Sequence, residues 1–205
     1  LSRSRLLDAT VDLIRRKGIQ GLSTAEVAAA CSMSHGSVFA HFGTREALLQ
    51  DAIGSEILRI AARMEAMLSV HAADPALSPS SGAPPSTGGV GRMLAHLLTV
   101  LSEEELFLSM LYRDFPFLPP IVQRRVAGME AALRTPLYDA LVAASQAVRP
   151  ASDESGKQPV SEDHGITMGL DAFFAMLIRL MTLRELYGFE KSILSERRDD
   201  VTLLF

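Results

Sequence analysis

The stretch Ser23–Arg45, STAEVAAACSMSHGSVFAHFGTR, is the most informative part of this chain. Its first half places small apolar residues at helical spacing behind Ser23, and Glu26 stands three residues after that serine, as in a capping box. The pattern stops at Ser32, and Ser34 offers a second N-cap. The stretch therefore predicts two short helices joined by a tight turn, which is a helix-turn-helix whose second helix enters the major groove of DNA.

The residues around this motif resemble the DNA-binding domain of the TetR family of bacterial transcriptional regulators. The second helix reads SHGSVFAHF over Ser34–Phe42, and Arg45 follows three residues later. Upstream, the resemblance to the family's first helix and glycine stop rests on Leu6, Leu7, Ala9, Leu13, Ile14 and Gly18. It spans roughly Arg3–Leu49. It implies an all-α fold with a three-helix DNA-binding head at residues 1–49 and a helical ligand-binding and dimerisation body at residues 50–205.

The resemblance also implies roles for residues of the head. His35 and Ser37 would face base edges, and the start of the preceding helix would approach the DNA backbone or a neighbouring base. Phosphates would be held by His41, Thr44 and Arg45, the threonine acting partly through the positive end of the next helix. The full expected DNA-binding set is Thr24, Ala25, Ser34, His35, Ser37, Phe39, His41, Thr44 and Arg45.

Three positions depart from the family's pattern. An aromatic hydroxyl and a second large ring are usual where Phe39 and Ala40 stand, so some contacts to phosphates or bases are missing. The turn glycine is replaced by Ser32, which either adopts a left-handed backbone conformation at some cost or tightens the turn differently. The motif could also be an ordinary packing of three small helices with His41 at the core edge, but the flanking helix, the glycine stop and Arg45 favour DNA binding.

Charge and composition fit a regulator of this kind. Residues 1–50 hold six basic and four acidic side chains, a net of +2, whereas the full chain of 205 residues carries −4. The head is not the strongly basic footprint of a nonspecific nucleic-acid coat. The single cysteine, Cys31, rules out an internal disulfide, is expected in a small buried slot and suits a reducing cytoplasm. No apolar run of membrane-spanning length is expected, so we predict a cytoplasmic protein without a membrane partner.

Helical periodicity continues through the body. Apolar residues recur at three- and four-residue steps over Arg45–Val70, which predicts one long helix leading out of the head. Breakers are dense over Ala73–Gly91, and a second polar break covers Arg149–Ser161, so both stretches are expected to be loops. Further helices are expected at Val90–Leu101, Glu103–Asp114 and Pro120–Val148. Pro136 is expected to kink or split the last of these.

A late segment is apolar nearly all round, because between Ala172 and Leu183 only Arg179 and Thr182 are polar. Such a helix is expected to be buried on two sides, one against its own core and one against a second copy. The resemblance likewise implies a four-helix dimer interface from the last two helices, here about Glu162–Tyr187 and Ser195–Leu204. The expected interface residues are Phe173, Leu177, Leu180 and Met181.

A ligand pocket is expected in the body, by resemblance and because methionine side chains make adaptable apolar walls. A few polar groups among them would orient an apolar or amphipathic effector. The same pattern also describes ordinary core, which is the alternative for each single residue. The expected pocket residues are Met64, Met67, Met93, His96, Phe107, Met110, Leu111, Tyr112, Met129, Tyr138, Asp171 and Phe174.

Neither catalysis nor a cofactor is indicated. The five histidines and the single cysteine show no metal-ligand spacing, and the sequence has no nucleophile elbow or phosphate loop. The sequence therefore predicts a homodimeric repressor that leaves a palindromic operator in double-stranded DNA when its effector binds, with half-sites about one helical turn apart. The alternatives are an activator, a ligand-insensitive regulator, or a helical small-molecule-binding protein that has lost DNA binding.

Overall fold

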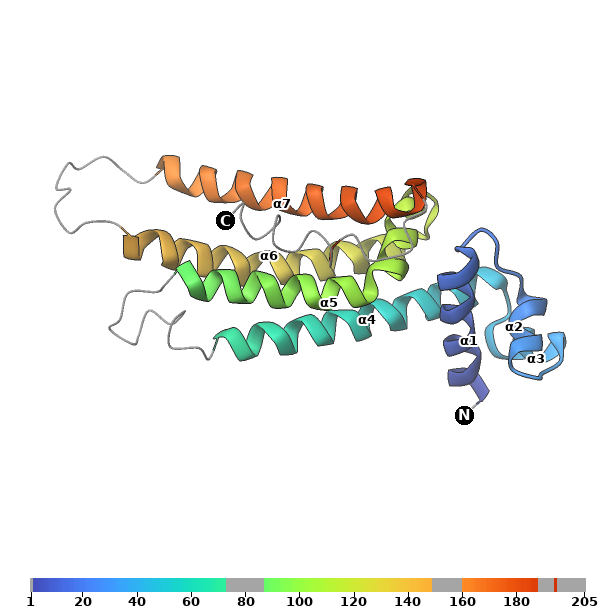
Figure 1. Cartoon of the computed structure of the whole chain (residues 1–205). Coiled ribbons are helices and arrows are strands. Elements are labelled where there is room, and N and C mark those ends of the chain that lie inside the picture. The colour runs from blue at the N-terminus through green and yellow to red at the C-terminus, as the bar shows by residue number, and fades with distance from the viewer. Residues whose placement is uncertain (1, 73–86, 149–159, 188–193, 195–205) are drawn as a thin grey trace. The chain divides into compact units, whose positions relative to one another are not determined.

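The computed structural model describes residues 2–72, 87–148, 160–187 and 194, where its regular elements are helices (Figure 1). The predicted all-α fold is confirmed. The elements in chain order are α1 (Ser2–Lys17), α2 (Thr24–Ala30), α3 (His35–Phe42), α4 (Arg45–Ala72), α5 (Thr87–Arg113), the 3-10 turn η2 (Phe115–Phe117), α6 (Pro120–Val148) and α7 (Val160–Tyr187).

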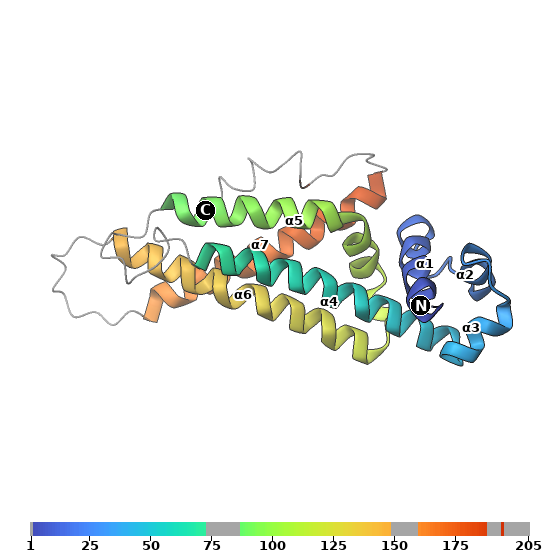
Figure 2. The same cartoon turned by 90° about the horizontal axis from the view of Figure 1, so that it is seen from below.

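The chain divides into two compact units, and each is described by itself. The first comprises Leu1–Ala61 with Glu104–Met129, and the second comprises Ala62–Glu103 with Glu130–Phe205. Helices α4, α5 and α6 contribute residues to both units. In the first unit, α1, α2, α3 and the start of α4 lie together (Figure 1). In the second unit, the α4 and α5 segments run side by side in both views (Figures 1 and 2).

The short helices of the first unit begin at the hydroxyls that the sequence marks. Ser23 has an extended backbone (φ −113°, ψ 146°), and its Oγ accepts the amide of Glu26, whose carboxylate accepts the amide of Ser23 in return. Ser34 Oγ accepts the amide of Ser37 at 3.2 Å at the start of α3. Thr44 Oγ1 accepts an amide of the first turn of α4 at 3.0 Å. These caps satisfy N–H groups that have no partner inside the helix.

The turn between α2 and α3 takes the left-handed conformation. Ser32 has φ +55°, which confirms one of the two alternatives for this position and carries a steric cost that a glycine would avoid. Cys31 beside it is buried, as expected. After α3, Gly43 (φ +74°) turns the chain into α4.

The long helix predicted from Arg45 is confirmed as α4, which runs to Ala72. Its apolar stripe is buried along the whole length, at Leu49, Ile53, Ile57, Ile60, Met64 and Met67. In the first unit this stripe belongs to a core that also includes Leu6, Ile14, Val27, Val38 and Leu48. Removal of these side chains from water is the main force that assembles the four helices.

The boundaries expected around α5 are wrong in two places. The helices predicted on either side of Ser102 form one continuous helix, because Ser102 Oγ donates to the carbonyl of Thr99 at 2.8 Å and does not interrupt it. The loop predicted over 73–91 overlaps α5 at 87–91, where Val90 is buried in the core and holds the glycine-rich start in helix. Residues 73–86 lie outside the described residues.

In the C-terminal third, Pro136 does not split α6, which is continuous from Pro120 to Val148. Its neighbours Leu133 and Leu137 are buried, so packing compensates the backbone hydrogen bond that proline cannot make. The break predicted over 149–161 ends earlier than expected, since α7 begins at Val160; residues 149–159 and the predicted helix at 195–204 lie outside the described residues.

Candidate nucleic-acid interface

Most of the side chains predicted to bind DNA are at the surface of α2, α3 and the start of α4, all in the first unit. Ser37 and Arg45 are half-buried, and Thr24 is buried with 9% of its surface exposed. The exposed members of the set are Ala25, Ser34, His35, Phe39, His41 and Thr44. The structure thus brings the predicted residues to one small region.

Thr24 and His35 join the starts of α2 and α3. Thr24 Oγ1 and His35 Nε2 are 2.7 Å apart, within hydrogen-bonding distance across eleven positions of sequence. The His35 ring meets Phe39 edge to face, with centroids 4.9 Å apart. Thr24 is therefore placed to orient His35.

Arg45, for which a phosphate contact was predicted, makes two hydrogen bonds inside its own domain. Its Nε donates to the carbonyl of Leu22 at 3.0 Å, and its Nη2 donates to the carbonyl of Ile19 at 2.9 Å. Both acceptors lie in the turn between α1 and α2. The guanidinium is therefore directed into its own domain.

Helix α1 is attached to α4 and to the helix-turn-helix through side-chain contacts that the sequence pattern does not indicate. Arg3 pairs with Asp51 at 2.5 Å, and its guanidinium lies 5.0 Å from the ring centroid of Phe42. Arg5 Nη2 donates to the carbonyl of Cys31 at 3.2 Å, and Cys31 Sγ donates back to the carbonyl of Arg5. These partners are 26 to 48 positions apart, so no local pattern indicates them.

A further ion pair fixes the start of α2. Lys17, the last residue of α1, bonds the carboxylate of Glu26. The pKa of Glu26 is lowered, first by this hydrogen bond and then by the bond from the backbone of Ser23. The carboxylate therefore stays ionised over the capping box and at the positive end of the helix.

A cluster of four charges lies deeper in the first unit, between α1, α4 and α5. Glu56 and Glu104 are buried, and both are contacted by Arg15 and Arg59. Arg59 donates two hydrogen bonds of 2.8 and 2.9 Å to Glu56, and these bonds are the main reason why the pKa of Arg59 is raised. The two arginines thus balance the negative charges of the buried carboxylates, because an ionised group is buried only at high cost without a partner.

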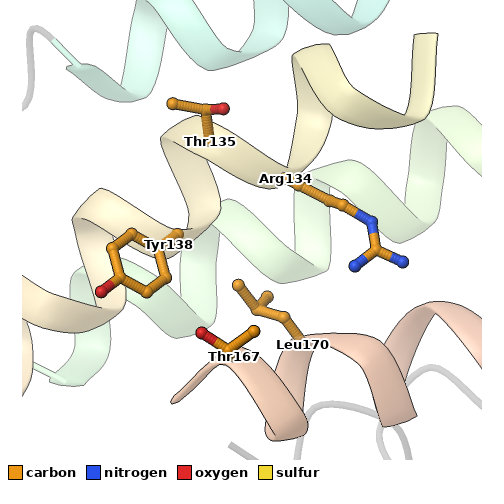
Figure 3. A pocket seen from close by; sticks show the side chains of 5 residues that line it. All are labelled: Arg134, Thr135, Tyr138, Thr167 and Leu170. Carbon is orange, nitrogen blue, oxygen red and sulfur yellow. The ribbon is translucent and has the colours of Figure 1, made fainter. Parts of the chain in front are cut away.

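A pocket of about 230 Å³ lies in the second unit between α6 and α7. Arg134, Thr135 and Tyr138 come from α6, and Thr167 and Leu170 come from α7 (Figure 3). Arg134 also bonds Asp171, and its guanidinium lies 4.8 Å from the ring centroid of Phe174. The lining surface is almost entirely apolar, although three of its residues carry hydroxyl groups.

The residues predicted to form a pocket are distributed over both units. Among them Tyr138 lines the pocket described above, and Asp171 is one residue from its wall. His96 is exposed and lies next to His71, with a nitrogen–nitrogen distance of 3.2 Å. Tyr112 is half-buried. The others are buried: Met64, Met67, Met93, Phe107, Met110, Leu111, Met129 and Phe174.

The predicted dimer residues are mostly buried within the single chain. Phe173, Leu177 and Met181 are each 2% exposed, and Leu180 is half-buried. A side chain already covered by its own chain adds almost no surface to an interface, so these three belong to the core of the second unit. The exposed residues of α7 at helical spacing are instead Met168, Ala172, Ala175 and Arg179.

Within the described residues, His164–Thr182 of α7 is long and apolar enough, by composition alone, to cross a membrane. This corrects the prediction from sequence that the chain has no apolar run of membrane-spanning length. The segment is 28% buried, and a single helix of this kind is weak evidence for a membrane span. Asp171 in this segment pairs with Arg134, and its apolar residues Phe173 and Leu177 pack inside the second unit.

The comparisons with known proteins point to the same part of the chain as the helix-turn-helix described above. Residues 6–52 match the family model described as bacterial regulatory proteins, tetR family, which confirms the resemblance drawn from the sequence. No curated protein sequence is significantly similar to the chain.

Solved structures extend the likeness over the whole chain at the level of fold. PfmR, a TetR family transcriptional regulator from Thermus thermophilus, is 19% identical with a TM-score of 0.64, covering 98% of this chain and 96% of its own. FadR from Bacillus subtilis, solved with stearoyl-CoA, is 11% identical with a TM-score of 0.62 and the same coverage. The fatty acid degradation regulator FadR from Bacillus halodurans is 11% identical, with a TM-score of 0.63 over 99% of this chain and 93% of its own.

Proposed function

We propose that this chain is a homodimeric repressor of transcription that binds a palindromic operator and leaves it when a small molecule occupies the helical body. The observation that carries the proposal is the start of α3, where the exposed His35 and the half-buried Ser37 stand on a domain that matches the TetR model over residues 6–52. A recognition helix with short polar residues at its N-terminus suits base contacts in the major groove.

Phosphate contacts would come from the surroundings of this helix. His41 is exposed at the end of α3, and the amides at the start of α4 lie beside Thr44. A helix N-terminus attracts anions through its dipole and its unpaired N–H groups. One head offers few base contacts, so two heads on a two-fold axis are needed for specific affinity.

The dimer contact would use the uncovered face of α7. Met168 is 70% exposed, and Ala172 and Ala175 follow it on the same face. Small residues let a second helix approach closely, and an exposed apolar stripe marks a surface for interaction. This assignment replaces the buried residues expected from the sequence.

The effector would enter the pocket between α6 and α7. Its volume of about 230 Å³ is below the 300–1,000 Å³ typical of drug-sized ligands, so the fitting ligand is a small amphipathic molecule. Because the lining surface is mostly apolar, the apolar part of the ligand would make most of the contacts, and one polar group would meet a hydroxyl such as that of Tyr138. A long acyl-CoA, the ligand of the Bacillus subtilis relative, is the competing class and needs a wider cavity.

Footprinting of genomic fragments at two salt concentrations tests the proposal. A palindromic, salt-sensitive footprint supports it, and Ser37→Ala should change the preference among sequences. The matched control is Ser55→Ala, a serine of α4 outside the reading surface, which should leave the footprint unchanged. Addition of small amphipathic molecules should release the operator, and Tyr138→Phe should weaken that release. Absence of any sequence-specific footprint would favour the small-molecule-binding alternative, and a footprint that no ligand alters would favour a ligand-insensitive regulator.

A further inference from the structure

Arg45 bridges two parts of the first unit that are distant in sequence. It is the first residue of α4, and its side chain reaches back to the carbonyls of Ile19 and Leu22 at 2.9 and 3.0 Å. The segment from Gly18 to Ser23 joins α1 to α2 and is called here the α1–α2 turn. A single guanidinium therefore holds this turn against the start of α4.

The α1–α2 turn has one narrowly defined shape. Gly18 has φ +76°, and its amide closes α1 on the carbonyl of Ile14 at 2.8 Å. At Gly21, a Cβ would lie only 2.7 Å from the carbonyl oxygen of Lys17, so any side chain would collide with backbone. The turn ends at Ser23, the N-cap of α2. Holding this turn therefore holds the position of α2.

The chemistry of the residue fits this role. A cation at the first position of a helix is opposed by the helix dipole, so its charge alone gives no reason for an arginine there. The planar guanidinium carries several donors in a fixed fork and can reach two carbonyls at once, whereas a lysine ammonium is a compact charge on a flexible stem. The two measured bonds use this fork.

We propose that Arg45 is a positioning residue that ties α2 to the start of α4, rather than a contact to DNA phosphate; the proposal rests on the DNA-binding function above. The short link through Gly43 and Thr44 connects α3 to α4, and the Thr24–His35 contact connects α2 to α3. With the Arg45 bonds, each of α2, α3 and the start of α4 is connected to the other two. A displacement of α4 then moves both helices of the motif together.

The test compares Arg45→Lys and Arg45→Gln with the unaltered protein, measuring operator affinity as a function of salt. Both variants should weaken binding by about tenfold, since each loses charge-assisted hydrogen bonds inside the domain. The slope of log K against log salt should stay unchanged, because no phosphate contact is lost. If lysine preserves the affinity while glutamine lowers it and reduces the slope by about 0.9, Arg45 contacts phosphate and the proposal is overturned.

Hydrogen exchange of the free protein gives a second readout that does not need DNA. Arg45→Lys should speed exchange at the amides of the α1–α2 turn and the first turn of α2, whereas a phosphate role predicts no change there. Arg16→Lys is the matched control, because Arg16 donates to the carbonyl of Asp12 within α1 and does not touch the turn. If exchange at these amides is as slow in Arg45→Lys as in the Arg16→Lys control, the proposal is overturned. Failure of the unaltered protein to bind any operator would count against the proposed function alone.

Discussion

Glu104 is the more deeply buried carboxylate of the four-charge cluster in the first unit, and its replacement gives a quantitative prediction. It is 4% exposed, and its Oε2 accepts from Arg59 at 2.6 Å and from Arg15 at 3.4 Å. Glu104→Gln removes the charge, keeps the shape and leaves an amide oxygen that can still accept. The change should lower the free energy of unfolding.

The magnitude follows from the geometry. Hydrogen bonds to charged groups contribute about 1.5–3 kcal/mol, and breaking a fully buried ion pair costs about 3–5 kcal/mol. Here the two arginine side chains are 32% and 42% exposed, so water relieves part of the loss. The 3.4 Å contact adds little, and Glu56 still pairs with both arginines. We expect a loss of about 1–2 kcal/mol.

Urea unfolding followed by circular dichroism measures this loss. The matched control is Glu103→Gln, the neighbouring glutamate on the same helix, whose side chain is 55% exposed and pairs with Arg63. A surface pair of that kind contributes about 0–1 kcal/mol, so the control should change stability by less than half as much. Equal losses in the two variants, or no loss in Glu104→Gln, would show that the buried cluster does not stabilise the fold as argued.

Three other predictions concern the helix-turn-helix. The pKa of Glu26 is lowered, so its pairing with Lys17 stabilises the fold above its ordinary pKa of 4.5 and loses that effect as pH falls through the lower folded value. In thermal unfolding, Glu26→Gln should therefore have a lower Tm than the unaltered protein at pH 7, and the two Tm values should converge in acid. Gly21→Ala should destabilise by about 1–3 kcal/mol in urea unfolding, because the new methyl group meets a backbone oxygen. Ser32→Gly should stabilise by about 0.5–1 kcal/mol, because it removes left-handed strain; a lower midpoint would refute this account.

Local sequence was enough to predict the features that depend on neighbours a few positions apart. Ser23 with Glu26, and Ser34 with Ser37, start helices through contacts that span three residues, so the pattern of residue types is enough to predict them. The repeated apolar steps of α4 work in the same way. The helix-turn-helix and the all-α fold were therefore predictable, and the match to the TetR model over residues 6–52 supports the same interpretation.

Packing in three dimensions selected the partner that each side chain meets. Sequence placed Arg45 on a phosphate and Phe173 on a second copy, whereas packing directs the first to carbonyls 23 and 26 positions away and buries the second in its own unit. An all-round apolar helix such as α7 has no marked face in its sequence. Its inward side is selected only when α6 packs against it, because burial depends on the position of other helices and not on local spacing.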